Sequence, residues 1–255
     1  MGEVIVVANQ KGGVGKTTTS ISLSSMLGEA GYHVLAIDAD QQGGLSSGYG
    51  IQGKDREHTL YDVFSGKASM DKLIISSRYY DVTVVSSDIK LSCADRDLIT
   101  PFDDNKYHIL EKNIEVVKDQ YDYIIIDCSP SLDIVTINAL VAADMIIIPV
   151  QSEYYAIEGL SKMIHILTFI EERFKHRFGQ IGILLTMFDP RCRLCDDVEK
   201  NLREHAVYKV FETKIPRNVR LAEAPSYGKP INAYSPKSSG AKAYREFVYE
   251  FLGKK

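Results

Sequence analysis

The stretch Lys11-Gly12-Gly13-Val14-Gly15-Lys16-Thr17-Thr18 decides the fold. An apolar run at residues 4–8, typical of a buried strand, precedes it, and a sequence with helical character at residues 17–28 follows it. Glycines allow successive backbone N–H groups to turn around phosphate oxygens, and the start of the next helix adds partial positive charge. We therefore predict a phosphate-binding loop between a strand and a helix.

Three residues of this loop carry specific expectations. Lys16 places a point charge on the β and γ phosphates of a nucleotide, and the Thr17 hydroxyl is placed to ligate Mg²⁺. The strict pattern G-x-x-x-x-G-K-S/T is not met, because Gln10 occupies its first glycine position and a second lysine, Lys11, follows. Lys11 is poorly placed to reach the phosphates of its own loop. A contact with the nucleotide of a second subunit and a solvated surface lysine are the two interpretations.

The rest of the chain alternates short β-branched runs with helical stretches. The strand-like runs are continuously apolar, which is typical of a parallel sheet covered on both faces. We predict a single α/β domain over residues 1–255, with a doubly wound, mostly parallel sheet flanked by helices and a ligand at the carboxyl ends of its strands. The predicted strands are 4–8, 34–37, 81–86, 123–126, 145–150 and 181–187, and the predicted helices are 17–28, 105–119, 133–142, 156–174 and a tail from 240.

Acidic residues end two of the predicted strands. Asp38 and Asp40 follow the run at 34–37, and Asp127 follows the run at 123–126. A carboxylate at this edge can hold Mg²⁺ through water or orient a water for attack on a γ-phosphate. We expect these acids to lie beside the phosphate loop. Acids that merely close a strand are the alternative.

The loop at 11–18, the acids at 38–40 and the strand ending in Asp127 resemble the deviant Walker A class of P-loop NTPases that contains ParA and MinD. Later blocks at 147–160 and 215–226 are similar to the ParA/Soj partition ATPases in particular. The resemblance extends from residue 4 to residue 252. It implies an ATPase that takes ATP and Mg²⁺ and yields ADP and phosphate.

The resemblance also implies roles for individual residues. Lys11 would cross toward the phosphates of a partner in a face-to-face homodimer held together by ATP. Asp40 would orient the attacking water. The implied catalytic residues are Lys11, Lys16 and Asp40; the implied nucleotide contacts are Lys11, Gly12, Gly13, Val14, Gly15, Lys16, Thr17 and Thr18, with Pro216 and Asn218 beside the adenine; the implied Mg²⁺ residues are Thr17, Asp38 and Asp127.

The sequence departs from the family pattern in the first switch loop. Gln41 stands where the family has proline, and Gly44 stands where it has asparagine. Loss of the proline frees the φ angle, so we expect a looser loop. The hydrolysis rate is therefore left open, and a nucleotide-gated scaffold with negligible turnover is a further alternative.

The net charge of −4 and pI of about 5.9 are too acidic for a dedicated nucleic-acid module, which usually has a pI above about 9. The family resemblance nevertheless implies binding of nonspecific double-stranded DNA by the ATP dimer. It also implies release through slow hydrolysis stimulated by a ParB-like centromere-binding protein, and a cytoplasmic, nucleoid-associated location. Solvated arginines are the alternative for the expected DNA contacts, which are Arg191, Arg193, Arg217 and Arg220.

Cys192 and Cys195 form the one motif that indicates a different function. Relatives of this ATPase class that carry iron–sulfur clusters have a C-x-x-C pair here, so an iron–sulfur carrier ATPase is one alternative. The four thiolates of a cluster would then come from two chains. A chance pair at a loop-to-helix turn is the other interpretation. Without an export signal, the thiols are expected to be reduced.

A MinD-like, membrane-cycling ATPase is a second alternative. Apolar residues recur at helical spacing from Tyr244 to Leu252, as in an amphipathic tail. The polar side of this tail mixes both signs of charge, whereas a surface anchor needs a strongly basic one. The longest apolar run, residues 145–150, is far shorter than the roughly 20 residues of a membrane-spanning helix. We expect a helix that closes over the core and no stable membrane association.

Overall fold

The computed structural model describes residues 2–98, 103–153 and 156–254. Tyr154 and Tyr155, which fall in one of the blocks similar to ParA/Soj, lie outside these ranges. Within them, one sheet has the strand order β3-β4-β2-β5-β1-β6-β7-β8, and neighbouring strands are parallel except β3 and β4. The strands are β1 (Glu3–Val7), β2 (Val34–Ala39), β3 (Ile74–Ser76), β4 (Val82–Val85), β5 (Tyr123–Cys128), β6 (Met145–Gln151), β7 (Gln180–Phe188) and β8 (Lys209–Pro216).

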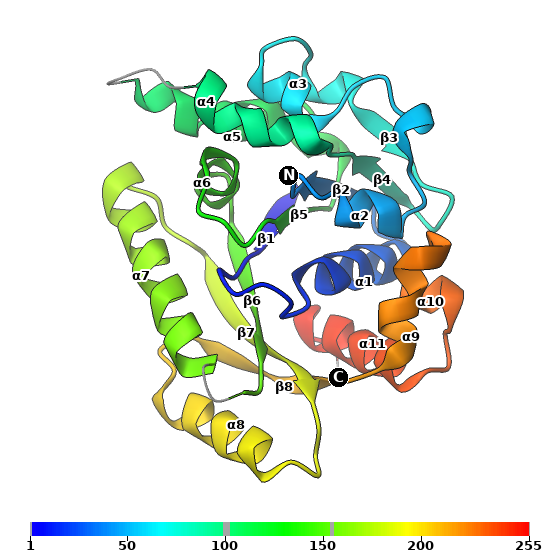
Figure 1. Ribbon diagram of the computed structural model, residues 1–255, viewed down its shortest axis with the longest axis vertical. Coiled ribbons are helices and arrows are strands. Elements are labelled where there is room, and N and C mark those ends of the chain that lie inside the picture. Colours follow the sequence, from blue (N-terminus) through cyan, green and yellow to red (C-terminus); the bar gives the residue numbers. More distant parts are fainter. Residues whose placement is uncertain (1, 99–102, 154–155, 255) are drawn as a thin grey trace.

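Helices cover both faces of the sheet, with α1 and α11 on one side and α6 and α7 on the other (Figure 1). The central strand shows why its sequence is continuously apolar: Val4 and Val6 pack on one face, and Ile5 and Val7 pack on the other. The helices are α1 (Lys16–Glu29), α2 (Gly44–Gly48), α3 (Leu60–Phe64), α4 (Ala94–Asp97), α5 (Ile109–Glu115), α6 (Ile134–Val141), α7 (Ala156–Phe174), α8 (Arg193–His205), α9 (Val219–Glu223), α10 (Ile231–Tyr234) and α11 (Ser239–Phe251).

The predicted doubly wound fold is confirmed, and its switch point lies at β1. The chain passes from β1 through α1 to β2 on one side of the sheet centre, and β6, β7 and β8 follow on the other side. A crevice outside the carboxyl end of β1 is where such a sheet binds its ligand. The loop at residues 11–18 leaves β1 at this point (Figure 1).

The helix predicted at residues 105–119 is wrong in extent. A 3₁₀ turn at Asp104–Tyr107 comes first, α5 covers only Ile109–Glu115, and a second 3₁₀ turn follows at Lys118–Gln120. His108 has φ −114° and ψ 12°, outside the α-helical region, and interrupts the helix. The predicted strands are confirmed within a residue or two. The sequence did not predict the strands β3 and β8, the helix α8, or the short helices α2, α3, α4, α9 and α10.

The tail from residue 240 is helical, as predicted, and its apolar face packs into the core. Tyr244, Phe247 and Val248 are buried, and the Tyr244 hydroxyl lies 2.9 Å from Thr19 Oγ1 of α1. This packing favours the core interpretation of the tail over a membrane anchor. In the described ranges, no helix combines the length and the apolar character needed to cross a bilayer.

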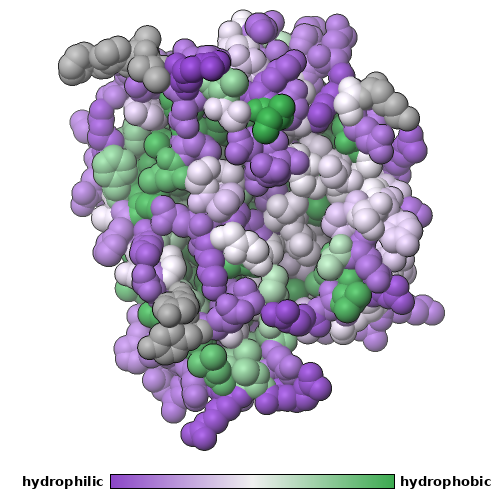
Figure 2. Space-filling view, in the orientation of Figure 1, coloured by the Kyte–Doolittle hydropathy of each residue, from purple (hydrophilic) through white to green (hydrophobic). Residues whose placement is uncertain are grey.

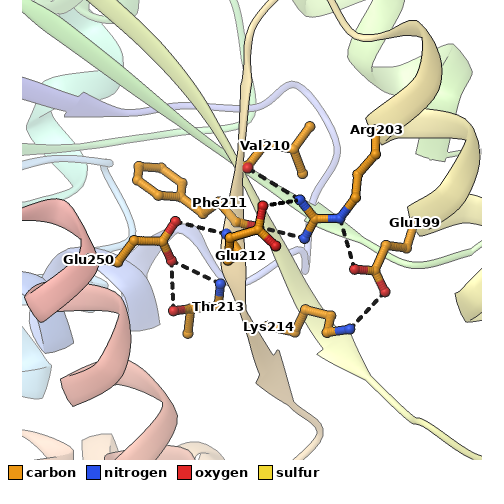
Figure 3. A network of polar contacts seen from close by, with 8 residues as sticks. All are labelled: Glu199, Arg203, Val210, Phe211, Glu212, Thr213, Lys214 and Glu250. Carbon is orange, nitrogen blue, oxygen red and sulfur yellow. Dashed lines mark hydrogen bonds and ion pairs between the residues drawn. The ribbon is translucent and has the colours of Figure 1, made fainter. Parts of the chain in front are cut away.

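Strand β8 lies at the edge of the sheet, and two side chains form hydrogen bonds with its backbone N–H and carbonyl groups (Figure 3). Arg203 of α8 donates to the carbonyl oxygens of Val210, at 3.5 Å, and Phe211, at 3.1 Å. The Glu250 carboxylate of α11 accepts from the N–H groups of Glu212, at 2.8 Å, and Thr213, at 2.9 Å. These four groups lie at or next to the shift in register between β7 and β8, and side chains satisfy them there.

Candidate functional site

The glycine-rich loop turns on two left-handed residues. Gly13 has φ +75° and Gly15 has φ +90°, conformations that glycine adopts at little steric cost. Gly15 caps α1, so Lys16 and Thr17 stand in the first turn of that helix. Beside the loop lies a pocket of about 570 Å³, bounded on its other sides by residues 40–42 and 129–131. Figure 2 shows the molecule in the orientation of Figure 1, with pale, near-neutral residues toward its centre and both hydrophilic and hydrophobic side chains around them.

Hydrogen bonds from two neighbouring strands hold the loop in place. Asn9 Nδ2 donates to the carbonyl oxygen of Pro149 in β6, at 2.8 Å, and Asn9 Oδ1 accepts from the Lys11 N–H. Thr186 of β7 donates from Oγ1 to the carbonyl oxygen of Val14, also at 2.8 Å. The buried Val14 therefore takes part through its backbone, and contacts within the chain shape the loop. Sequence reasoning missed Thr186, which has no local motif.

Lys16 is 7% exposed, although it carries the charge that a phosphate would meet. Its Nζ donates to the carbonyl oxygen of Lys11 at 3.2 Å. Burial lowers its pKa, and the negative charge of Asp127 acts in the opposite direction. Because burial destabilises the charged form of this ammonium group, a bound anion such as a phosphate would stabilise it.

Asp38 and Asp127 face each other in register on β2 and β5, and both are fully buried. Burial raises the pKa of Asp127 to about 8, and the charge of Asp38 adds to this rise. Ser20 Oγ donates to Asp127 Oδ1 at 2.8 Å, whereas Asp127 Oδ2 is buried with no hydrogen-bond partner in the described chain. An orphaned carboxylate oxygen beside Thr17 fits a hard cation such as Mg²⁺.

Both carboxylate oxygens of Asp38 accept hydrogen bonds, whereas only one of Asp127 does. Its Oδ2 accepts from both the N–H and the hydroxyl of Ser46, each at 2.7 Å, and its Oδ1 accepts from the Asp40 N–H at 3.3 Å. Burial raises its pKa to about 6. Asp38 thus ties α2 to the end of β2 beside the candidate cation site. The serines Ser20 and Ser46 were missed from the sequence, although Ser20 lies one helical turn after Lys16.

Asp40 borders the phosphate pocket and is half-buried. Its Oδ1 accepts from the Gln42 N–H at 2.9 Å, and its carbonyl oxygen accepts from the Gly43 N–H at the same distance. A Cβ at Gly44 would lie 3.1 Å from Cγ2 of Thr17. The glycine that replaces the family's asparagine therefore lets α2 approach the first turn of α1 closely.

A second pocket of about 220 Å³ continues from the first, and both include Gly15, Thr18 and Met187. Pro216 and Asn218 line it, as expected of residues beside a base. Asn218 also holds structure: Oδ1 accepts from the Arg220 N–H, and Nδ2 donates to Ser239 Oγ. Met187 has φ +52°, a strained value for a non-glycine residue, at the junction of the two pockets.

Lys11 contacts an acid of its own chain. Its Nζ lies 3.2 Å from Oε2 of Glu153, just after β6, and both side chains are partly exposed. The ammonium group therefore turns away from the phosphate pocket of its own loop, for which it is not among the lining residues. Glu153 was not singled out from the sequence.

The four predicted arginines lie after β7 and β8, whose ends are in register at Phe188 and Pro216. Arg191 makes two bonds with Asp189, at 3.0 and 2.9 Å, and Arg220 pairs with Glu223 at 2.8 Å. In the described chain, the exposed side chains of Arg193 and Arg217 form no ion pair or hydrogen bond. The four side chains thus gather at one edge of the sheet, and two of them are already neutralised.

Cys192 caps the N-terminus of α8, and Cys195 lies in its first turn. Cys192 is half-buried and Cys195 is buried. Across residues 2–98, 103–153 and 156–254, no group of three or more His, Cys, Asp or Glu side chains is arranged to hold a metal ion. One chain therefore offers two thiols at this place.

Comparisons with known proteins identify the family of this chain. Residues 2–180 match the AAA domain family. The chain is 43% identical over 250 residues to the sporulation initiation inhibitor protein Soj of Bacillus subtilis, with 98% of each protein covered. It is 40% identical over 254 residues to the chromosome-partitioning ATPase Soj of Treponema pallidum, covering 100% of this chain and 98% of that protein.

The chain belongs to the Soj/ParA family of chromosome-partitioning ATPases. A solved structure of cobyrinic acid a,c-diamide synthase from Mycobacterium smegmatis, with bound ATP analog and magnesium, shares the fold of this partition ATPase. The TM-score is 0.83 at 29% identity, with 99% of this chain and 95% of that chain covered. The predicted P-loop fold, family and ATPase activity are confirmed.

Proposed function

We propose that residues 1–255 form one ATP-binding domain that works as a nucleotide-switched DNA-partitioning protein. ATP with Mg²⁺ drives a face-to-face homodimer, the dimer binds nonspecific double-stranded DNA, and slow hydrolysis releases it. A ParB-like partner accelerates hydrolysis, and the protein works on the nucleoid in the cytoplasm. The observation that carries the proposal is one sheet edge that holds both the pocket beside the glycine-rich loop and four exposed arginines.

In the first step, the loop residues Gly12 to Thr18 hold the phosphates. Backbone N–H groups of the loop and the N-terminus of α1 surround the phosphate oxygens, and Lys16 places its charge on them. Thr17 and Asp127 would hold Mg²⁺, with Asp38 next to them. When bound, the cation neutralises charge on the β and γ phosphates. Pro216 and Asn218 border the pocket that would take the adenine.

In the second step, Asp40 orients the water that attacks the γ-phosphate. Its position at the rim of the phosphate pocket supports this role, since the carboxylate is half-buried and held by one backbone N–H. Gln41 lines the same pocket and replaces a proline, so the loop retains a backbone donor that proline lacks. We propose that hydrolysis is slow until a partner protein fixes this loop.

Dimerisation requires Lys11 to exchange one partner for another. In the single chain, Lys11 pairs with Glu153. In the dimer, it would leave Glu153 and contact the phosphates bound by the other subunit. Because the Lys11–Glu153 pair is exposed, breaking it costs little, about 1 kcal/mol or less.

DNA binding uses the arginines after β7 and β8, namely Arg191, Arg193, Arg217 and Arg220. Phosphate contacts need only positive groups, so this face binds without sequence preference. Two copies of the patch in a dimer double the number of phosphate contacts and steepen the salt dependence of binding. A net charge of −4 on each chain keeps the monomer's own affinity low.

The test is a binding titration of the purified protein on nonspecific duplex DNA with ATP, with ADP and without nucleotide, at low and moderate salt. We expect binding with ATP alone, in parallel with a dimer in sedimentation, and its loss as salt is raised. Equal DNA binding in all three nucleotide states would contradict control of binding by the nucleotide. An ATP-bound dimer that does not bind DNA would contradict only the DNA-binding role of the four arginines.

A further inference from the structure

Cys192 and Cys195 are brought together by the first turn of α8. The Cys195 N–H donates to the Cys192 carbonyl oxygen at 2.9 Å, which closes the turn. Residues three apart in such a turn are neighbours with Cβ atoms about 5–6 Å apart, and a small movement of the turn brings them to the roughly 3.5–4.5 Å of a disulfide. Burial raises the pKa of the Cys195 thiol, and a hydrogen bond with the Cys192 thiol adds to the rise. The two cysteines therefore share the first turn of α8.

The two thiols differ in their access to solvent. Cys192 is half-buried, at the cap position of the helix, and can meet a small reagent. Cys195 is buried, and its Sγ donates to the carbonyl oxygen of Ser152, just after β6, at 3.4 Å. This is the arrangement of a dithiol pair, with one thiol accessible for attack and one behind it that resolves the product.

We propose that Cys192 and Cys195 form a reversible intrachain disulfide in exchange with low-molecular-weight disulfides. A metal cluster needs four thiolates, and one chain supplies two here. A two-electron thiol–disulfide reaction needs two thiols, which one chain does supply. The disulfide itself needs neither ATP nor DNA to form, although Cys192 lies between Arg191 and Arg193 of the proposed DNA face.

The reaction proceeds in two exchanges. The Cys192 thiolate attacks one sulfur of the small disulfide RSSR, which forms a Cys192–S–S–R bond and releases RS⁻. The Cys195 thiolate then attacks Cys192 Sγ, which forms the Cys192–Cys195 bond and releases the second RS⁻. The two cysteines lose two electrons and two protons, and RSSR gains them to become two RSH.

Oxidation has a structural consequence outside the pair. A disulfide sulfur has no proton, so Cys195 can no longer donate to the Ser152 carbonyl oxygen. The Ser152 hydroxyl is itself buried without a partner in the described chain. One hydrogen bond between the residue after β6 and α8 is therefore lost, next to the Glu153 that holds Lys11.

The test uses the full chain with Cys93→Ser, which removes the other partly exposed thiol. The protein is incubated with oxidised glutathione, denatured, and its free thiols are counted and mapped by mass spectrometry without reduction. We expect the loss of two thiols, a Cys192–Cys195 disulfide within one chain, and full recovery with dithiothreitol. No nucleotide or DNA is present, so failure here is distinct from failure of the proposed partition function.

Two further variants in the same background distinguish the roles of the thiols. Cys195→Ser is expected to retain glutathione on Cys192 as a stable mixed disulfide. Cys192→Ser is expected to lose no thiol, because Cys195 is buried. The proposal is overturned if the Cys93→Ser protein keeps all its thiols, holds glutathione on Cys192 without forming the internal bond, or forms the disulfide between chains.

Discussion

The carboxyl ends of β1, β2 and β5 and those of β7 and β8 belong to the same sheet edge, but their polar side chains are satisfied differently. In the first region, Asp38 and Asp127 are buried and fixed by serines, and one Asp127 oxygen is without a partner in the described chain. In the second region, Arg191 is exposed and paired with an acid, and Arg217 is exposed and unpaired. The first region is built for a compact, fixed ligand. The second carries charges that can be redirected toward an extended one.

Lys16→Ala is expected to have the largest effect and to break the first region. Removal of the ammonium group leaves the phosphates without their main counter-charge, so ATP affinity should fall by roughly 100-fold or more. Isothermal titration calorimetry measures this loss. Lys200→Ala, at an exposed position on α8, is the matched control and should bind ATP normally. Unchanged affinity in Lys16→Ala would remove the phosphate-loop assignment.

Asp40→Ala separates chemistry from binding within the first region. The phosphate loop and the acids at Asp38 and Asp127 remain, so ATP should still bind and the dimer should persist. Hydrolysis should slow by roughly 100-fold, the scale of a lost proton-transfer or water-orienting group. Phosphate release and sedimentation with ATP report the two properties. A variant that hydrolyses ATP at the normal rate would exclude Asp40 from the mechanism, and Asp119→Ala at an exposed site is the control.

Two substitutions sharpen the description of the second region. Arg217→Ala should weaken binding of nonspecific DNA by roughly two- to fivefold and reduce its salt slope by about one. Asp189→Asn should instead strengthen binding, because it frees the Arg191 guanidinium from its acid. Arg191 holds the pKa of Asp189 at about 2, so the carboxylate is charged throughout the working pH range.

The control for this pair is Arg78→Ala, since Arg78 is exposed and precedes β4, at the opposite edge of the parallel sheet. Filter binding with ATP at two salt concentrations compares all three variants. If Arg78→Ala weakened binding as much as Arg217→Ala, DNA would be responding to total charge rather than to this face.

Glu153→Gln is expected to have the smallest effect. It removes the charge that holds Lys11 in the single chain, so Lys11 is free to reach a partner. The ATP concentration needed for half-maximal dimerisation should fall by roughly two- to fivefold, the value of an exposed ion pair. Glu158→Gln breaks a similar exposed pair, with Lys162, and should leave the midpoint unchanged. A rise in the midpoint for Glu153→Gln would show that Glu153 supports the dimer.

The first region could be predicted from the sequence because the residue patterns that mark it are short and contiguous. Glycine spacing marks the loop, and continuous apolar runs that end in acids mark β2 and β5. What could not be read depends on contacts between distant segments, such as Thr186 with Val14 or Ser46 with Asp38. Neither hydroxyl stands in a motif, so only the folded chain assigns it a partner.

The second region was harder to predict for a different reason. β8 is an edge strand in which Lys209, Glu212 and Lys214 interrupt the apolar pattern, so its sequence does not indicate a buried strand. The arginines were named through family resemblance, and no sequence pattern indicated that Asp189 and Glu223 would bind two of them. The Arg191–Asp189 pair is set by the loop after β7, and the Arg220–Glu223 pair by the three-residue spacing on α9, a helix that the sequence did not predict.

The side chains on β8 also determine how copies of this protein can associate. An uncovered edge strand accepts a strand from another molecule and lets sheets join end to end. Here, Arg203 and Glu250 already bind the carbonyl and N–H groups at the middle of β8. A docking strand would have to displace two charged side chains that are held by their own helices. Pairing of a second sheet with the middle of β8 is thereby disfavoured.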